Sequence, residues 1–100
     1  MQFIVLGYDG SDQGAVERRA SAREQHLKLA SELYEKGKIL YATAILNDDG
    51  KMIGSMILCE YESREELQNQ WLQHEPYVLG KVWQKVEICR AQAAPFCSRK

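Results

Sequence analysis

The order in which strand-like and helix-like patterns follow one another most constrains the fold of this chain. Residues 3–8 form a short apolar run that ends in turn residues, and residues 15–36 show helical periodicity up to Gly37, a natural helix stop. Two more apolar runs, 39–46 and 51–61, are joined by the turn Asn-Asp-Asp-Gly. The first half of the chain therefore predicts a strand, a helix and a β-hairpin.

The second half of the chain repeats the helix-then-strand pattern. Ser63 and Glu66 form a capping box, which opens a second helix that runs to about Gln73. Residues 82–91 have the composition of a last strand. The complete order, βαββαβ, predicts an α+β fold of the ferredoxin-like type, with a four-stranded antiparallel sheet and two helices on one face.

Two of the expected strands are apolar on both faces. A sheet that has helices on one side and water on the other alternates apolar and polar residues. Residues 3–6 and 52–58 do not alternate in this way. We therefore expect a homodimer that packs sheet against sheet. The alternative is a short strand that is apolar by chance.

Length and charge limit the classes of function. One hundred residues suit a single domain, which we place at 1–94, followed by a C-terminal tail at 95–100. A net charge of -1 and a pI of about 6.1 do not suit a protein that binds nucleic acid or anionic membranes. No segment approaches the roughly 18 apolar residues of a membrane span.

The cysteines and the N-terminus bear on the compartment. Cys59, Cys89 and Cys97 lack C-x-x-C spacing, and their odd number argues against a closed disulfide framework. The apolar run at the N-terminus is too short for a signal peptide and lacks a basic start. We expect a cytoplasmic protein.

Polar residues interrupt the apolar stripe of the first helix. On a helical wheel, Arg23 lies about 20° from the centre of the stripe that contains Val16 and Leu27, while Arg19 and His26 lie on its shoulder. A buried guanidinium needs a carboxylate or carbonyl partner. Alternatively, the arginine stem covers the edge of the sheet and its charged end reaches water.

A carboxylate partner for His26 is available in the stretch His-Glu-Pro-Tyr. Pro76 disfavours the helical conformation at Glu75, so we expect the Glu75 carboxylate to lie outside the regular helix. In this topology the exit of the second helix can approach the first helix. A carboxylate beside an imidazole fixes its tautomer and raises its basicity, which suits general acid–base catalysis. The alternative is that His26 is only a packed, hydrogen-bonded residue.

These residues also resemble a known family. The spacing R-x-x-x-R-x-x-H in the first helix, then Gly37, then H-E-P-Y-V-L-G at 74–80 is similar to the YciI family. The resemblance runs from the first strand to about Arg90. It implies a dimeric ferredoxin-like fold, within the wider dimeric α+β barrel group, and a His-Asp pair at a proposed active site. One type of member is a dehydrochlorinase that acts on a chlorinated hydroxyquinol, and most members have no assigned substrate.

The resemblance also suggests a role for each matching residue. His26 corresponds to the family histidine and Arg23 to the arginine one turn before it, while Glu75 stands where the family has Asp. His26 and Glu75 are thus the candidate catalytic pair. The longer Glu side chain either keeps the contact through another rotamer or misses the histidine.

The remaining site candidates are expected to contact substrate. They are Arg19 on the first helix, Ser55 on the third strand and Tyr77 in the late motif. Ser55 matches a small polar residue that is common in the family, although a small filler in a tight sheet explains it equally well.

Two functional hypotheses follow from these residues. The first is a small lyase or isomerase in which His26 and Glu75 act as general acid or base on a small organic substrate, such as a cyclic or aromatic compound. The second is a non-catalytic dimeric module that binds a small ligand or another protein. We expect no cofactor, because cofactor motifs are absent, and no metal, although His26, His74 and Glu75 could in principle provide ligands.

Overall fold

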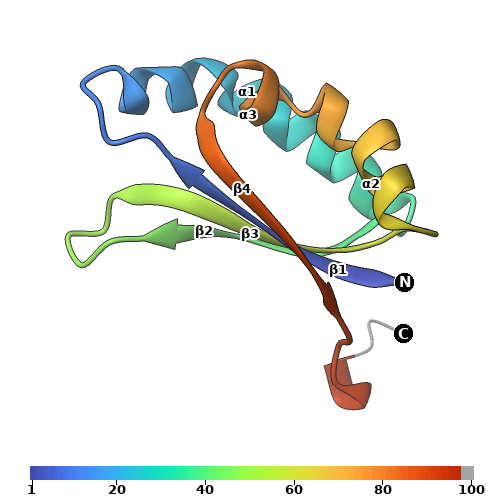
Figure 1. Cartoon of the computed structure of the whole chain (residues 1–100). Coiled ribbons are helices and arrows are strands. Elements are labelled where there is room, and N and C mark those ends of the chain that lie inside the picture. Colours follow the sequence, from blue (N-terminus) through green and yellow to red (C-terminus); the bar gives the residue numbers. More distant parts are fainter. Residues whose placement is uncertain (98–100) are drawn as a thin grey trace.

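The computed structural model describes residues 1–97 and has the predicted α+β architecture (Figure 1). Four strands form one sheet: β1 (Gln2–Asp9), β2 (Ile39–Leu46), β3 (Met52–Glu60) and β4 (Trp83–Ala91). The helical elements are α1 (Ala15–Glu35), α2 (Arg64–Gln70), the 3-10 turn η1 (Leu72–His74), α3 (Pro76–Leu79) and the 3-10 turn η2 (Pro95–Cys97). The strand order is β2-β3-β1-β4, and all neighbouring strands are antiparallel. Helices α1, α2 and α3 cover one face of this sheet, as Figure 1 shows. The ferredoxin-like fold is confirmed.

Local sequence accounts for the ends of α1 and of the hairpin. Gly37, at a φ of 77°, follows the last helical turn, where its N–H and that of Lys38 donate to carbonyls of that turn. Only glycine adopts this left-handed conformation without strain. In the hairpin loop, Gly50 has a φ of 82°, and the side-chain oxygen of Asn47 accepts hydrogen bonds from two backbone N–H groups. Both turns therefore form where the sequence predicts them.

The second helical region differs from the prediction of one helix to about Gln73. Ser63 caps α2 by accepting a hydrogen bond from the Glu66 N–H, as expected. However, α2 ends at Gln70, and η1 and the short helix α3 follow. Glu75 is extended and caps α3, with Pro76 in its first turn. Proline is favoured there because it lacks an N–H that the helix would leave unpaired. His-Glu-Pro-Tyr thus begins a helix rather than simply ending one.

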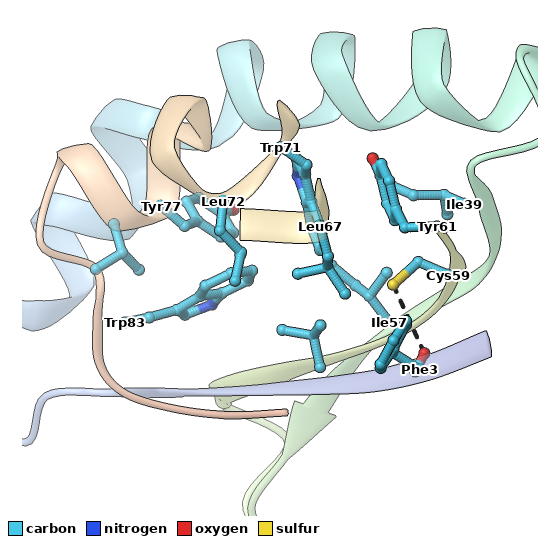
Figure 2. Packing of buried hydrophobic residues seen from close by; sticks show 12 residues of the cluster. Phe3, Ile39, Ile57, Cys59, Tyr61, Leu67, Trp71, Leu72, Tyr77 and Trp83 are labelled. Carbon is cyan, nitrogen blue, oxygen red and sulfur yellow. Dashed lines mark hydrogen bonds between the residues drawn. The ribbon is translucent and has the colours of Figure 1, made fainter. Parts of the chain in front are cut away.

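The hydrophobic core lies between the helices and the inner face of the sheet. Figure 2 shows Phe3, Ile57 and Cys59 of the sheet facing Leu67 and Trp71 of the α2 region. All five are almost completely buried. This core holds α2 against β1 and β3, and it therefore determines where the segment after α2 crosses α1.

The predicted domain ends at residue 94, and its tail extends over 95–100. Residues 95–97 form η2, in which Phe96 is exposed. Residues 98–100 lie outside the described residues. The domain boundary at residue 94 stays a prediction.

Candidate active site between helix α1 and the sheet

The side chains of His26 and Glu75 meet beneath α1. The His26 Nδ1 atom lies 2.5 Å from Glu75 Oε2, and both residues are buried. Glu75 reaches this position because it caps α3, where its backbone is extended and its side chain turns back toward α1. The additional methylene of glutamate therefore does not prevent contact with the histidine.

Three N–H groups surround the Glu75 carboxylate. Besides His26, the indole Nε1 of Trp71 donates to Oε1 at 2.9 Å, and the backbone N–H of Tyr77 donates to Oε2 at 3.0 Å. A carboxylate can accept all three bonds, whereas a protonated carboxyl group would present a donor of its own. With its proton on Nδ1, a neutral His26 ring keeps its lone pair on Nε2. Trp71 was not among the site residues expected from the sequence, and this hydrogen bond adds it to the site.

The orientation of the His26 ring is set by two aromatic side chains. Tyr77 stacks on the imidazole with ring centres 3.8 Å apart and planes within 9° of parallel. The Trp83 ring meets His26 edge-on at 6.0 Å and Tyr77 at 5.6 Å. Figure 2 shows Tyr77 and Trp83 close together at one end of the core. The stacked Tyr77 ring and the edge contact with Trp83 therefore hold the imidazole in this orientation.

Trp83 fits against the sheet because Gly7 has no side chain. A Cβ atom at Gly7 would lie 2.3 Å from the Trp83 ring, which no packed structure tolerates. The Trp83 N–H then donates to Ser55 Oγ at 3.3 Å. Ser55 therefore links β3 to the Trp83 ring, a contact that its residue type alone did not indicate.

Arg19 forms the second buried ion pair of the site. Its guanidinium donates to both carboxylate oxygens of Asp9 at 2.8 and 2.9 Å, and also to Ser55 Oγ at 3.2 Å. The guanidinium carbon lies 4.9 Å from the centre of the Tyr77 ring. Asp9 is the first of the turn residues expected after the strand at 3–8, but in the structure it ends β1 and balances the charge of Arg19. Its position at the end of a strand was the only signal for this role.

The predicted orientation of α1 was wrong. Val16 and Leu27 are 76% and 46% exposed, whereas Arg19 and His26 face inward. The buried stripe is turned by about 100°, or one residue, from the apolar stripe. It includes these polar residues because Asp9 and Glu75 offset the cost of burying them. Arg23 is consequently exposed rather than central, and within residues 1–97 it has no ion-pair partner.

A cavity of about 200 Å³ opens beside His26, between α1 and strands β2 and β3. Five of the six residues predicted for the site line it: Arg19, Arg23, His26, Ser55 and Tyr77. Its apolar wall consists of Leu27, Ala42, Ala44, Met52 and Ile57. Glu75 lies behind His26 and does not line the cavity. Within residues 1–97, the Nε2 atom of His26 has no hydrogen-bond partner.

Burial affects the protonation of Tyr77. Loss of contact with water raises the pKa of the Tyr77 hydroxyl, and the positive charges of Arg19 and Arg23 partly oppose this change. The phenol therefore stays protonated at neutral pH. In this form Tyr77 can donate a hydrogen bond to a ligand.

A second, larger groove lies on the outer side of α1 and α3. It has a volume of about 770 Å³ and is lined by residues that include Arg18, Gln25 and His74. His74 therefore opens into a different depression from His26. Among residues 1–97, no three histidine, cysteine or acidic side chains are grouped as metal ligands would be.

Comparisons with known proteins agree with this fold. The model of the YCII-related domain matches residues 1–92. Among solved structures, a 5-chloro-2-hydroxyhydroquinone dehydrochlorinase from Burkholderia phenoliruptrix AC1100, in complex with 2,5-dihydroxybenzoquinone, superposes with a TM-score of 0.78. The two proteins are 23% identical, and the match covers 96% of this chain and 98% of the dehydrochlorinase chain. A search of curated proteins finds no significant match.

Two further findings complete the comparison. Within residues 1–97, no helix has both the length and the apolar character required to cross a bilayer. The family match extends from the first strand through the last and includes every residue of the candidate site. The chain belongs to the family of YCII-related domains.

Proposed function

We propose that this protein is a small lyase or isomerase that uses His26 as a general base. One observation carries the proposal: a buried carboxylate holds one nitrogen of His26, while the other nitrogen is unpartnered on a ring that lines a cavity. General bases need this combination of fixed orientation and access to substrate. If His26 were only a packed residue, side chains would occupy both ring nitrogens.

The reaction would begin with the transfer of a proton from a C–H or O–H group of the substrate to His26 Nε2. In a lyase, the electron pair of that bond forms a new double bond while the leaving group departs with the electron pair of the bond that held it. In an isomerase, the proton returns to a different carbon atom. Glu75 would stabilise the imidazolium that forms, since its carboxylate accepts a hydrogen bond from Nδ1–H throughout.

The other cavity residues would bind and orient the substrate. Arg23 is free to bind an anionic or hydroxyl group, and Arg19 and Tyr77 offer further donors. The oxygen of Ser55 already accepts hydrogen bonds from Arg19 and Trp83, but its own hydroxyl proton remains available. The dehydrochlorinase with the same fold acts on a chlorinated, hydroxylated ring, and a cavity of about 200 Å³ suits a molecule of that size.

Chloride release from 5-chloro-2-hydroxyhydroquinone tests this function directly. A parallel screen of small cyclic ketones in D₂O would detect isomerase-type proton exchange by NMR. We expect His26→Gln to lower turnover by about 10²–10⁴-fold, the usual contribution of a general base. Lys28→Gln is a matched control, because Lys28 is exposed on the same helix and lies outside the cavity. A His26→Gln variant as active as the wild type would rule out the role of base.

A non-catalytic module that binds a small ligand is the alternative. Ligand binding without turnover of any compound in the screen would favour it. In that case His26 and Glu75 would close the cavity and position the ligand, and their substitution would change affinity only.

We also propose that two copies of the chain pair through the open face of the sheet. Val5 and Ile57 point into the core, so the alternating residues Leu6 and Met56, which are neighbours in register, point away from the helices. Ile4 and Leu58 continue this apolar strip. Such a strip on an uncovered sheet face supports association.

We further propose a cytoplasmic location, which the thiols support. Within residues 1–97, Cys59, Cys89 and Cys97 are all unpaired. Exposed free thiols such as Cys89 and Cys97 support a reducing, cytoplasmic setting.

A further inference from the structure

The charges around the candidate cavity are unevenly distributed. Among residues 1–97, its lining contains two arginines and His26 but no carboxylate. The Arg19 charge is already offset by Asp9, at 2.8 Å. Arg23 is the cation in this lining that has no partner within residues 1–97, and it is exposed at the edge of the cavity. An anionic group in the cavity would therefore meet one uncompensated positive charge.

The protonation of His26 completes this balance. The charged and titratable groups facing the ring are Glu75 and Tyr77 from the α3 segment and Arg19 and Arg23 from α1, while Trp83 of β4 is neutral. Asp9 of β1 acts through Arg19. With a neutral His26 ring and a neutral Tyr77, the charges of Asp9, Arg19, Arg23 and Glu75 cancel. With a protonated ring, the group carries one net positive charge.

We propose that the cavity binds small organic monoanions and that His26 takes up one proton as each anion binds. This inference rests on the same site as the proposed function and deepens it, because an anion beside a protonated His26 is also the state that follows transfer of a substrate proton to the ring. The anion accepts a hydrogen bond from the Nε2–H of the imidazolium, while Nδ1–H remains bonded to Glu75. Arg23 contributes the second favourable contact, and the net charge of the occupied site is zero.

The volume limits the size of the anion. About 200 Å³ corresponds to roughly seven water molecules at ~30 Å³ each. A single six-membered ring that carries one carboxylate or one ionised hydroxyl group is of this size. The apolar wall, which includes Leu27, Met52 and Ile57, suits the face of such a ring.

The direction of the pH dependence follows from linkage. If anion binding favours the protonated ring, the protonated ring must bind the anion more tightly by the same factor. Affinity is then greatest at low pH and falls as the pH rises and the ring loses its proton. On this alkaline limb, one linked proton lowers affinity about tenfold per pH unit.

Calorimetric titration with benzoate and its neutral analogue benzamide tests the proposal. We would measure both ligands between about pH 6 and about pH 9, in buffers with different heats of ionisation, so that proton uptake is measured directly. We expect benzoate to bind at least about tenfold more tightly than benzamide, with uptake approaching one proton on the alkaline limb. Equal affinities for the two ligands, no detectable benzoate binding, or a flat pH profile would each overturn it.

Single substitutions then test which charged side chains contribute to benzoate binding. Arg23→Gln should weaken benzoate binding about tenfold and leave benzamide unchanged, whereas Lys28→Gln removes an equal charge from the same helix without effect. His26→Gln should abolish the pH slope. The wild-type profile alone suffices if that variant does not fold. None of these measurements needs turnover. Proton-linked benzoate binding in a protein that turns over no compound in the screen would therefore support this inference and contradict the proposed enzymatic function.

Discussion

Glu75 Oε2 lies 2.5 Å from His26 Nδ1, although 49 positions separate the two residues in the sequence. The contact forms because Glu75 caps α3, which packs against α1. Trp71 and the Tyr77 backbone hold the carboxylate from the other side. The pair is therefore part of the hydrogen-bonded core.

Glu75→Gln should change the tautomer of His26. The glutamine amide has one acceptor oxygen where the carboxylate had two. Its NH₂ group would therefore face one of the N–H donors of Trp71 or Tyr77, or would turn toward His26 Nδ1. We expect the ring proton to move from Nδ1 to Nε2, a loss of about 1–3 kcal/mol in the free energy of unfolding, and a fall in turnover. Nitrogen-15 NMR of the ring and urea denaturation measure the first two effects. Glu65→Gln, on the exposed side of α2, is the control, and an unchanged tautomer would contradict the prediction.

The Asp9–Arg19 pair predicts a double-mutant result. Asp9→Leu leaves a buried guanidinium without its carboxylate and should cost about 3–5 kcal/mol in the free energy of unfolding. Replacing both residues, with Asp9→Leu and Arg19→Met, removes the unpaired charge and should restore much of that loss. Urea denaturation of the single and double variants measures the difference. If the double variant is no more stable than Asp9→Leu, the pair is not coupled as the distances imply.

Alkaline pH should destabilise the fold through Cys59. Burial raises the pKa of this thiol from 9.0 to about 12, so between these values the unfolded chain loses a proton that the folded chain retains. The stabilisation is therefore complete below about pH 9 and is lost as the pH rises toward 12. Burial raises the pKa of the Tyr61 hydroxyl as well, which adds to the same loss.

Cysteine variants separate the contribution of Cys59 from the total loss of stability at alkaline pH. Cys59→Ala should flatten the decline in unfolding free energy above pH 9, even though the smaller side chain lowers stability at neutral pH. Cys89→Ala removes an exposed thiol and should leave the decline unchanged. Denaturation curves at several alkaline pH values provide the comparison, and parallel slopes for both variants would argue against Cys59.

Leu6→Lys should prevent association of the chain. Leu6 and its neighbour Met56 lie on the uncovered face of the sheet, where a buried ammonium group would have no partner. Light scattering coupled to gel filtration should show a dimer for the wild type and a single chain of about 11.5 kDa for the variant. Val16→Lys, on the exposed side of α1, should remain dimeric. A wild-type protein that elutes as a single chain would disprove the sheet-to-sheet dimer.

The sequence alone determined the order of the strands and of the first helix, the hairpin and the fold class, although it did not show that the second helical region is divided. These depend on local rules: Gly37 stops α1, Gly50 forms the turn, and Ser63 caps α2. The short range of such interactions makes them readable from neighbouring residues. The motif His-Glu-Pro-Tyr likewise indicated that Glu75 leaves the regular helix, because proline restricts the residue before it.

Tertiary structure decided which face of α1 turns inward and which partners complete the site. The apolar residues predicted that the face with Val16 and Leu27 turns inward, but the face that packs against the sheet contains Arg19 and His26. Their burial is possible only because Asp9, at the end of the preceding strand, and Glu75, 49 positions after His26, meet them after folding. No local pattern encodes such a partner, since the benefit of burying a charge depends on the charge it meets after folding.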